Sequence, residues 1–300
     1  MKQTESDYGG TVCKVDGKLE WTGKINLIED KLDLLYQWKK PQRIFVNSMA
    51  DLFHKDVPFE FIDRLFVAME ENPHHTYQIL TKRPARMREF VGWRQEQIGK
   101  FNGNDWNPEG NIHLLVSCST QSDADRFIPD LLKTPATVRG VSLEPLIGPV
   151  DLTEWLTSEG DCDLCNGEGS VPVYDGGKMC PKCNYDRRNY MGPAQLDWIV
   201  IGGESGPMAR SCDQEWIRSI VKQCASAEVP CFVKQMGSNS LRHTPDGQGA
   251  WSGLHRGGKM IGVGNFVAHA VNPRYRDGAG RKPETWPEDL RVQQFPEVSK

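Results

Sequence analysis

The fold is decided by the stretch Asp197-Trp-Ile-Val-Ile-Gly-Gly-Glu-Ser-Gly206, an apolar run that ends in glycines and polar side chains. Four other stretches share this design: RIFVNSMAD (43–51), YQILTKRP (77–84), VRGVSLEP (138–145) and VPCFVKQMG (229–237). Buried parallel strands are typically continuous apolar runs, because helices cover both faces of the sheet. Ligand sites of α/β proteins collect at the carboxyl ends of such strands. The five polar strand ends therefore predict one ligand-binding site, lined by the carboxyl ends of several strands.

Between these runs the chain alternates between strand and helix patterns. We expect strands at 43–47, 76–80, 111–117, 137–142, 197–201 and 230–234, and a further short strand at 24–28. We expect helices at 29–38, 59–71, 84–98, 122–132 and 213–227, the last with Asp213 as its N-cap. Repeated βα units imply a parallel sheet with right-handed crossovers. The predicted fold is an α/β fold, an incomplete parallel (β/α) barrel of about six strands.

The alternation of strand and helix patterns also indicates how the chain is divided into segments. Residues 1–22 are expected to be irregular, and 23–150 to form the first part of the barrel. Residues 151–196, rich in Gly, Cys, Asp and Asn, resemble an insertion between two strands. Residues 197–237 then complete the barrel, and 238–300 form an irregular C-terminal extension.

Composition bounds the class of protein. The 300 residues suit one large α/β domain or two small ones. The net charge of −4 gives no bulk positive field for nucleic acid, although a local basic patch is compatible with it. No apolar run approaches the ~18 residues that a spanning helix needs, and the first ten residues lack the apolar core of a signal peptide. We therefore expect a cytoplasmic protein without a membrane partner.

The strongest single motif is a pair of CxxC sequences, Cys162-Asp-Leu-Cys165 and Cys180-Pro-Lys-Cys183. Each CxxC places two thiolates on one ion, and two such knuckles close a tetrahedral Cys₄ zinc site. In a reducing compartment this spacing favours metal over disulfides. An iron–sulfur cluster and a redox pair are the alternatives. A closed zinc site would serve to fold the insertion.

Directly after the strand expected at 197–201 come Gly202, Gly203, Glu204 and Ser205. Glycines there let the backbone approach a ligand, and Glu204 is suited to an amine or a ribose hydroxyl. The dinucleotide fingerprint GxGxxG is not met. The alternative is a tight βα turn without a ligand.

The other strand ends offer a mixed set of ligand groups. Lys82 and Arg83 are suited to a phosphate or a carboxylate, and the alternative is that Thr81 caps the following helix while the cations are solvated. Asn47, Ser48 and Asp51 precede His54, so that Asp51 and His54 could form a metal site or an acid/base pair. The alternative for His54 is a surface or capping role.

Two late strand ends complete the candidate pocket. Ser142 and Glu144 end one strand, and Lys234 and Gln235 end another. A lysine at the end of a buried strand is costly unless it is paired, for instance with Glu144 or Glu204. The alternative for Glu144, which precedes Pro145, is a simple strand-ending turn.

In order, VNSMADLFH (46–54), LTKRP (80–84), SLEPLIGP (142–149), IGGESG (201–206) and VKQ (233–235) resemble motifs of the phage gene product 37 / gene product 68 family. That family carries a domain-of-unknown-function label. The resemblance covers roughly residues 20–300 and includes the tail WPEDLRVQQFP (286–296). It implies a TIM-like barrel of the radical S-adenosylmethionine type, in which three cysteines hold a [4Fe–4S] cluster and S-adenosylmethionine takes the fourth iron site. The phage context suggests nucleic acid or nucleotides as substrate, in a host cytoplasm.

The sequence departs from the family where the cluster should be. Before Arg43 it contains one cysteine, Cys13, and no CxxC. The gene could be truncated or split, with the cluster on a separate segment. The chain could instead be a degenerate member that kept a pocket without the cluster. In a third explanation, the cysteines from Cys162 to Cys183 hold iron.

Two hypotheses for function follow. In the first, the chain is a radical S-adenosylmethionine-type enzyme or its cluster-less remnant, acting on nucleic acid or nucleotides. Its cofactor would contact the turn from Gly202 to Ser205, and its substrate would lie among the polar side chains of Asn47, Asp51, Lys82, Arg83, Glu144 and Lys234. In the second, it is a non-catalytic zinc protein that binds nucleic acid or a phage or host partner.

Overall fold

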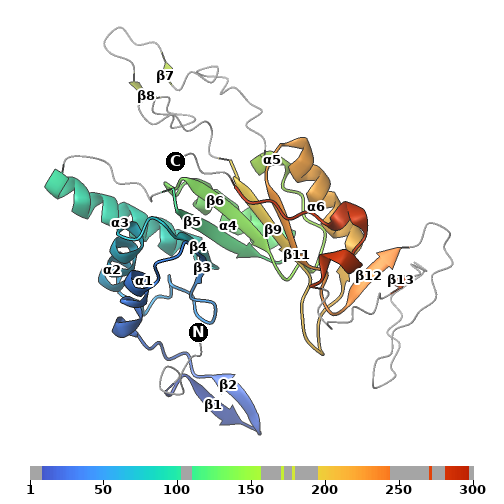
Figure 1. The fold of residues 1–300 in the computed structure, drawn as a ribbon, viewed down its shortest axis with the longest axis horizontal. Coiled ribbons are helices and arrows are strands. Elements are labelled where there is room, and N and C mark those ends of the chain that lie inside the picture. Colours follow the sequence, from blue (N-terminus) through green and yellow to red (C-terminus); the bar gives the residue numbers. More distant parts are fainter. Residues whose placement is uncertain are drawn as a thin grey trace. The chain divides into compact units, whose positions relative to one another are not determined.

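The structure is a computed structural model of the chain, and it describes residues 9–102, 110–156, 170–171, 178–179, 195–243, 270–271 and 281–296 (Figure 1). The chain divides into two compact units. The first comprises Met1–Leu114 and Thr134–Thr137, with Lys300, and the second comprises Leu115–Lys133 and Val138–Ser299. Each unit is described by itself.

The central element is a six-stranded sheet in the order β11-β9-β6-β5-β4-β3. Its strands are β3 (Arg43–Val46), β4 (Thr76–Thr81), β5 (Ile112–Cys118), β6 (Val138–Leu143), β9 (Trp198–Gly202) and β11 (Cys231–Gln235). The pairs β3–β4, β6–β9 and β9–β11 are parallel. Each strand of the sheet lies beside the next one along the chain, which is the strand order of an incomplete parallel barrel. The predictions of an α/β fold and of about six parallel strands are confirmed.

Four main helices alternate with these strands: α2 (Phe59–Glu70), α3 (Pro84–Asn102), α4 (Gln121–Leu132) and α6 (Gln214–Ser226). The predicted ends of α2, α4 and α6 hold to within one residue, whereas α3 continues four residues beyond the predicted end. The side chain of Asp213 accepts a hydrogen bond from the Glu215 N–H, which confirms the predicted N-cap of α6. Thr120 caps α4 in the same way.

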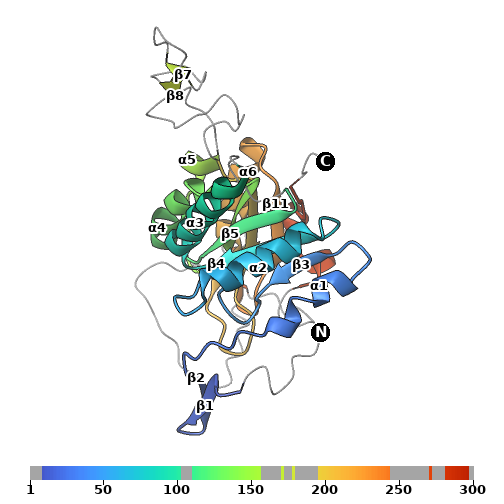
Figure 2. The same ribbon diagram turned by 90° about the vertical axis from the view of Figure 1, so that its left-hand side faces the viewer.

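The core of the first unit forms where α2 and α3 meet the sheet, and α2 runs along β3 and β4 (Figure 2). Along β4 the buried residues alternate, because successive side chains point to opposite faces of a strand. The Phe90 ring of α3 packs against Phe53 and Phe66, with centroids 6.0 and 4.9 Å apart. Burial of such rings is the main favourable term holding these layers together.

The N-terminal predictions need three corrections. Within 1–22, predicted to be irregular, β1 (Val12–Val15) and β2 (Lys18–Trp21) form an antiparallel hairpin. Its turn, Asp16–Gly17, has positive φ at both residues, as the favoured two-residue hairpin turn requires. Residues 24–28 form no strand. The helix predicted at 29–38 is reduced to a 3-10 turn, Glu29–Lys31, and the short α1, Leu34–Gln37. Leu35 is the one buried residue of these two pieces, so there is little apolar burial to stabilise a longer helix.

The C-terminal region, predicted to be irregular, contains ordered pairing. Strand β12 (Ser240–His243) pairs with β10 (Cys212–Asp213) and β13 (Ala270–Val271), and η3 (Pro283–Thr285) and η4 (Glu288–Leu290) are 3-10 turns. Residues 292–294 run antiparallel along β11, where the Val233 N–H donates to the Val292 carbonyl (2.8 Å) and the Gln294 N–H to the Cys231 carbonyl (2.8 Å). The final segment therefore covers one edge of the sheet.

Buried His113 on β5 makes the stability of the first unit dependent on pH. The side chain is 4% exposed, and burial lowers its pKa to about 4. Between the ordinary histidine pKa near 6.5 and about 4, the unfolded chain binds more protons than the folded chain, so stability falls as the pH falls through that window. We expect the protonation of His113 to lower the unfolding free energy of the first unit by about 3 kcal/mol between neutral pH and about pH 4.

The measurement is urea unfolding of the wild type and of His113→Leu at about pH 7.5 and about pH 4. The wild type should lose about 3 kcal/mol more than the variant between the two conditions. Equal losses in the two proteins would show that this histidine does not sense acid.

Candidate functional site

The ends of three strands of the second unit meet at the side chain of Glu144. Its carboxylate accepts hydrogen bonds from Nζ of Lys234 (2.7 Å) and Nε2 of Gln235 (2.9 Å). The Gln235 amide also donates to the carbonyl of Gly203 (2.8 Å), which links β6, β9 and β11. We call Glu144, Lys234 and Gln235 the Glu144 cluster. Of the two carboxylates predicted as partners of Lys234, Glu144 is the one that it contacts.

The Glu144 cluster opens to solvent on one side. The Lys234 side chain is 55% exposed and that of Glu144 is 17% exposed. Because Lys234 is largely exposed, its ion pair contributes little, so the ammonium group can exchange this partner for a ligand at a cost of about 0–1 kcal/mol. Ser142, predicted in the same pocket, is buried within β6.

The two glycines after β9 are required by the chain's own packing. A Cβ at Gly202 would lie 3.0 Å from Oε1 of Glu144. A Cβ at Gly203 would lie 2.4 Å from the carbonyl oxygen of Met236 and 2.9 Å from Cα of Gly237. These glycines let the ends of β9 and β11 approach each other closely. Their predicted contact with a cofactor stays a prediction.

Glu204 is held by Arg210 in the same loop. Its carboxylate accepts from the Arg210 backbone N–H (2.8 Å), from Nε (2.8 Å) and from Nη2 (3.0 Å). The side-chain hydrogen bonds from Arg210 lower the pKa of Glu204 to about 2. The neighbouring Ser205 is exposed. A ligand amine would have to displace three hydrogen bonds from Arg210 to reach Glu204, whereas Lys234 donates a single hydrogen bond to Glu144.

The polar strand end of the first unit centres on Asp51. Its carboxylate accepts from the hydroxyl of Thr81 (2.7 Å), Nη1 of Arg83 (2.7 Å) and the backbone N–H groups of Phe53 (3.0 Å) and Lys82 (3.1 Å). The Thr81 hydroxyl also accepts from the Arg83 N–H (2.9 Å), which is the capping alternative predicted for it. Asp51 therefore fastens the loop after β3 to the end of β4.

His54 is not paired with the Asp51 carboxylate. Nδ1 of His54 accepts from the Asp56 N–H (3.3 Å), and the carboxylate of Asp56 lies 3.7 Å away. The structure does not bring the side chains of Asp51 and His54 together as the predicted acid/base pair or metal site requires, because the Asp51 carboxylate accepts from Phe53 and from the end of β4. The alternative, a local capping role for His54, fits these contacts.

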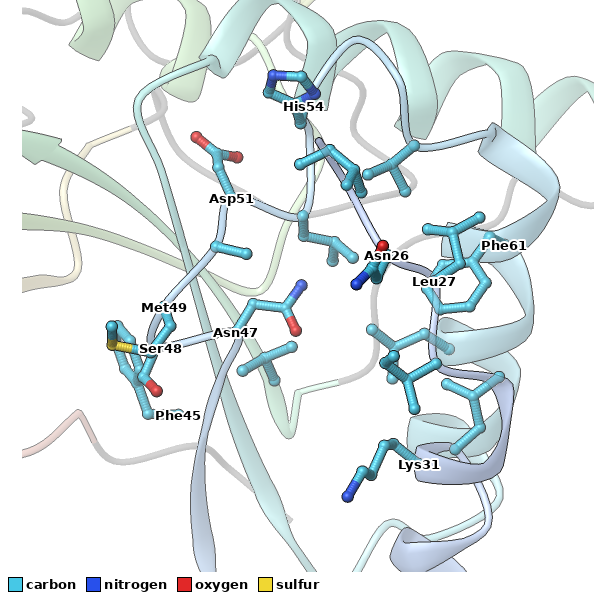
Figure 3. Close-up of a pocket in the computed structure, with 18 of the residues that line it drawn as sticks. Asn26, Leu27, Lys31, Phe45, Asn47, Ser48, Met49, Asp51, His54 and Phe61 are labelled. Atoms are coloured by element: carbon cyan, nitrogen blue, oxygen red, sulfur yellow. The ribbon is translucent and has the colours of Figure 1, made fainter. Parts of the chain in front are cut away.

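A groove of about 860 Å³ lies in the first unit beside β3. In Figure 3, Phe45, Asn47, Ser48 and Met49 form one side of it, and Asn26, Leu27, Lys31 and Phe61 form the other. Asn47 ends β3 with φ of 57°, a left-handed conformation that asparagine tolerates. The volume is within the range of small-molecule pockets.

The residues that the structure describes do not fit an iron–sulfur cluster. Among them no three His, Cys, Asp or Glu side chains gather as metal ligands. Burial raises the pKa of the Cys212 thiol to about 12, and a hydrogen bond with Cys224 together with burial raises the pKa of Cys231. An iron–sulfur cluster is held by ionised cysteine thiolates, and burial of these cysteines disfavours ionisation of their thiols. Cys162, Cys165, Cys180 and Cys183 lie outside the described residues, so the zinc site stays a prediction.

Sequence reasoning missed Arg210 and the groove. Arg210 lies six residues beyond Glu204 across an irregular loop, where no helical or strand period relates the two positions. The groove depends on residues 24–28, which were expected to be a strand. Only the tertiary arrangement reveals either feature.

The fold and the sites define an α/β protein that presents polar groups at the carboxyl ends of parallel strands, as ligand-binding proteins of this class do. The chain belongs to the family described as protein of unknown function (DUF5131), whose model matches residues 2–281. No curated protein and no solved structure matches the chain. In the described part of the chain, no helix is both long enough and apolar enough to cross a membrane.

Proposed function

We propose that this chain is a phage-type family member that binds S-adenosylmethionine at the Glu144 cluster and forms the binding part of a radical S-adenosylmethionine-type enzyme. Nucleic acid or nucleotides are its proposed substrates. The resemblance of its motifs to those of the phage gene product 37 / gene product 68 family supports this proposal. So does the strand order, which suits a partial TIM-like barrel.

One observation carries the proposal: a carboxylate and an ammonium group lie 2.7 Å apart at the strand ends. An α-amino acid carries an ammonium and a carboxylate on one carbon, so Glu144 and Lys234 match its two charges. The methionyl end of S-adenosylmethionine is such a group. Gln235 keeps the Glu144 carboxylate in place, because its amide is itself fixed by the Gly203 carbonyl. Half-exposed Lys234 gives the ligand access from solvent.

S-adenosylmethionine supplies a reactive sulfonium centre when it is bound. The chain's own contribution is to bind and orient the methionyl end through Glu144 and Lys234, while Gln235 and the Gly203 carbonyl hold Glu144 in place. No reductive step is assigned to the described residues, because they do not fit a [4Fe–4S] cluster. In this proposal a separate cluster-bearing segment provides those thiolates.

The test replaces the carboxylate that would receive the ammonium group. Glu144→Gln keeps the size of the side chain and removes its charge, and we expect it to weaken S-adenosylmethionine binding by about 10–100-fold in calorimetry. Glu215→Gln, which changes an exposed acid paired with Arg218 on α6, is the matched control and should leave affinity unchanged. Equal affinities for the wild type and Glu144→Gln would remove the Glu144 cluster from the proposal.

The proposal that the substrate is a nucleic acid or a nucleotide depends on Lys82, the lysine that follows β4. Lys82 is exposed, and its ammonium group contacts no carboxylate in the part of the chain that the structure describes. We expect Lys82→Ala to weaken binding of a single-stranded oligonucleotide and to reduce the salt slope by about 1. Fluorescence anisotropy at several salt concentrations measures both the affinity and the salt slope. Lys55→Ala is the control, because Lys55 already pairs with Asp56 and should leave both unchanged. An unchanged slope would count against a phosphate contact at Lys82.

The second candidate function is a non-catalytic zinc protein that binds nucleic acid or a phage or host partner. It is favoured by the antiparallel pairing of β7 (Ser170–Val171) with β8 (Lys178–Met179). Because the strands run in opposite directions, the chain enters at Ser170 and leaves at Met179 at the same end of the ladder. One CxxC pair precedes β7 in sequence and the other follows β8, which suits a shared metal.

The zinc hypothesis predicts the behaviour of one cysteine variant. We expect Cys165→Ser to lose bound zinc, measured by elemental analysis, while the thermal unfolding of the rest of the chain is unchanged. Cys13→Ser, which alters an exposed free thiol, should retain the metal. Global unfolding of Cys165→Ser would contradict a separate insertion. Stoichiometric zinc without S-adenosylmethionine binding would favour this second function.

A further inference from the structure

We infer that His74 and His75 form a pH switch, which holds the segment 38–42 on the start of β4 at neutral pH and releases it when His75 takes up a proton. The switch lies at the amino ends of β3 and β4 in the first unit, and it is independent of the chemistry proposed for the Glu144 cluster. Three observations carry the inference: the shared acceptor of the two rings, the fixed tautomer of His75 and the charges on the elements around it.

Two imidazole rings bind one backbone carbonyl. Nε2 of His74 and Nε2 of His75 each lie 3.0 Å from the carbonyl oxygen of Trp38, the C-cap residue of α1. A carbonyl oxygen can only accept a hydrogen bond, so both nitrogens carry a proton and donate it. A carbonyl at the end of a helix lacks a donor within that helix, and the two rings supply donors here. The pair therefore fastens the end of α1 to the loop before β4.

The second ring nitrogen of His75 is fixed as an acceptor. The Gln42 N–H donates to Nδ1 of His75 (3.2 Å), and Nδ1 can accept only while it carries no proton. The adjoining backbone is also paired, because the Thr76 N–H donates to the Gln42 carbonyl (2.9 Å) and the Asn111 amide donates to the His75 carbonyl (3.1 Å). Protonation of Nδ1 would set one N–H against another, and the segment 38–42 would lose this anchor.

The surroundings of His75 disfavour a positive charge on its ring. The residue is 1% exposed, and its ring centroid lies 4.0 Å from that of exposed His74. Trp38 and Tyr77 pack against the His75 ring in T-shaped contacts. Burial and the neighbouring His74 lower the pKa of His75. The neutral ring therefore stabilises the closed switch above the ordinary histidine pKa of about 6.5, and this contribution is lost as the pH falls below that value.

The described elements that contact the pair bring no acid to offset a charge on it. Residues 34–37 and 72–81 carry no acidic side chain, and the charged residues within 38–43 are all cations: Lys39, Lys40 and Arg43. Glu71, the acid nearest in sequence, accepts a hydrogen bond from the Tyr36 hydroxyl (2.5 Å). Among the described residues, His54 is the one histidine within ion-pair distance of a carboxylate. A proton on His75 is therefore left uncompensated while the switch is closed.

Hydrogen exchange of the full chain, followed by NMR, tests the release. Between about pH 7.5 and about pH 5.5, we expect the protection of the Gln42 amide, corrected for its intrinsic exchange rate, to fall about tenfold. The Tyr77 amide, which donates to the Asn111 carbonyl (2.7 Å), should stay better protected than Gln42 at both pH values, because only the segment opens. Unchanged protection of Gln42, or equal protection of the two amides, would overturn the switch.

Three histidine variants assign the effect to one ring. In His75→Gln, protection of the Gln42 amide should no longer depend on pH in this range. His54→Gln, at another loop histidine of the first unit, is the matched control and should keep the dependence of the wild type. His74→Gln removes the neighbouring charge and should raise the pH at which the Gln42 amide is released. A dependence that persists in His75→Gln would contradict the assignment.

The tautomer of His75 gives a test that needs no variant. Long-range proton–nitrogen NMR of the wild type identifies which ring nitrogen carries the proton. At about pH 7.5 we expect a proton on Nε2 and none on Nδ1, with Nδ1 protonated over the same pH range in which the Gln42 amide loses protection. A proton on Nδ1 at neutral pH, or a His75 titration that leaves the Gln42 amide protected, would overturn the inference. Glu144→Gln should change neither readout, which separates this switch from the proposed function.

Discussion

Gly203→Ala should disrupt the Glu144 cluster and lower the unfolding free energy of the second unit by about 3 kcal/mol. The added Cβ would lie 2.4 Å from the Met236 carbonyl oxygen and 2.9 Å from Cα of Gly237. Both atoms belong to backbone, so no flexible side chain can move aside. The ends of β9 and β11 would have to separate, and Gln235 would lose its bond to the Gly203 carbonyl.

The matched control is Gly148→Ala in the same unit, where a Cβ would meet no atom within 4 Å. Urea unfolding should place this control within about 0.5 kcal/mol of the wild type. A Gly203→Ala protein as stable as Gly148→Ala would show that the two strand ends lie further apart than described.

Arg94→Met should cost the first unit about 3–5 kcal/mol of unfolding free energy. Arg94 of α3 is 2% exposed, and it donates to Asp63 (2.5 Å) and Glu70 (2.5 Å) of α2. Removing the guanidinium leaves two partly buried carboxylates without the cation between them. The cost arises from those uncompensated charges as much as from the lost bonds.

Arg64→Met provides the comparison within the same unit. Arg64 pairs with Glu29 at 2.6 Å, but both side chains are more than half exposed, so the expected loss is about 0–1 kcal/mol. Chemical denaturation of both variants measures the difference. Similar losses for the two would mean that burial of Arg94 does not set the strength of its ion pairs.

Much of the fold was predictable because its strands are continuous apolar runs between polar ends. The predicted bounds of β9 and β11 hold to within one residue, since both are mainly apolar runs that end in polar residues or glycine. The β1–β2 hairpin had a local signal in Asp16–Gly17, which the prediction of an irregular N-terminus overlooked. The pairing of residues 292–294 with β11 had no local signal, because covering a sheet edge is a tertiary event.

The candidate site was predictable only in part. The polar residue types at the strand ends follow from sequence, but their partners depend on strand register. The pairing of Leu143 with Ile201, and of Ile201 with Val233, brings Glu144 beside Lys234. Glu204 was an equally plausible partner for Lys234 from the sequence, but its carboxylate accepts hydrogen bonds from Arg210.

The most direct test of the proposed function is an amide NMR titration of the full chain with S-adenosylmethionine, since it reports both binding and its location. The proposal predicts saturable shifts at Gly202 and Gly203 and at the residues from Lys234 to Gly237, with Glu144→Gln losing them. Free methionine should shift the same amides more weakly, because it carries the same two charges without the adenosyl group. An unchanged spectrum at saturating S-adenosylmethionine, or shifts that exclude these strand ends, would contradict the account.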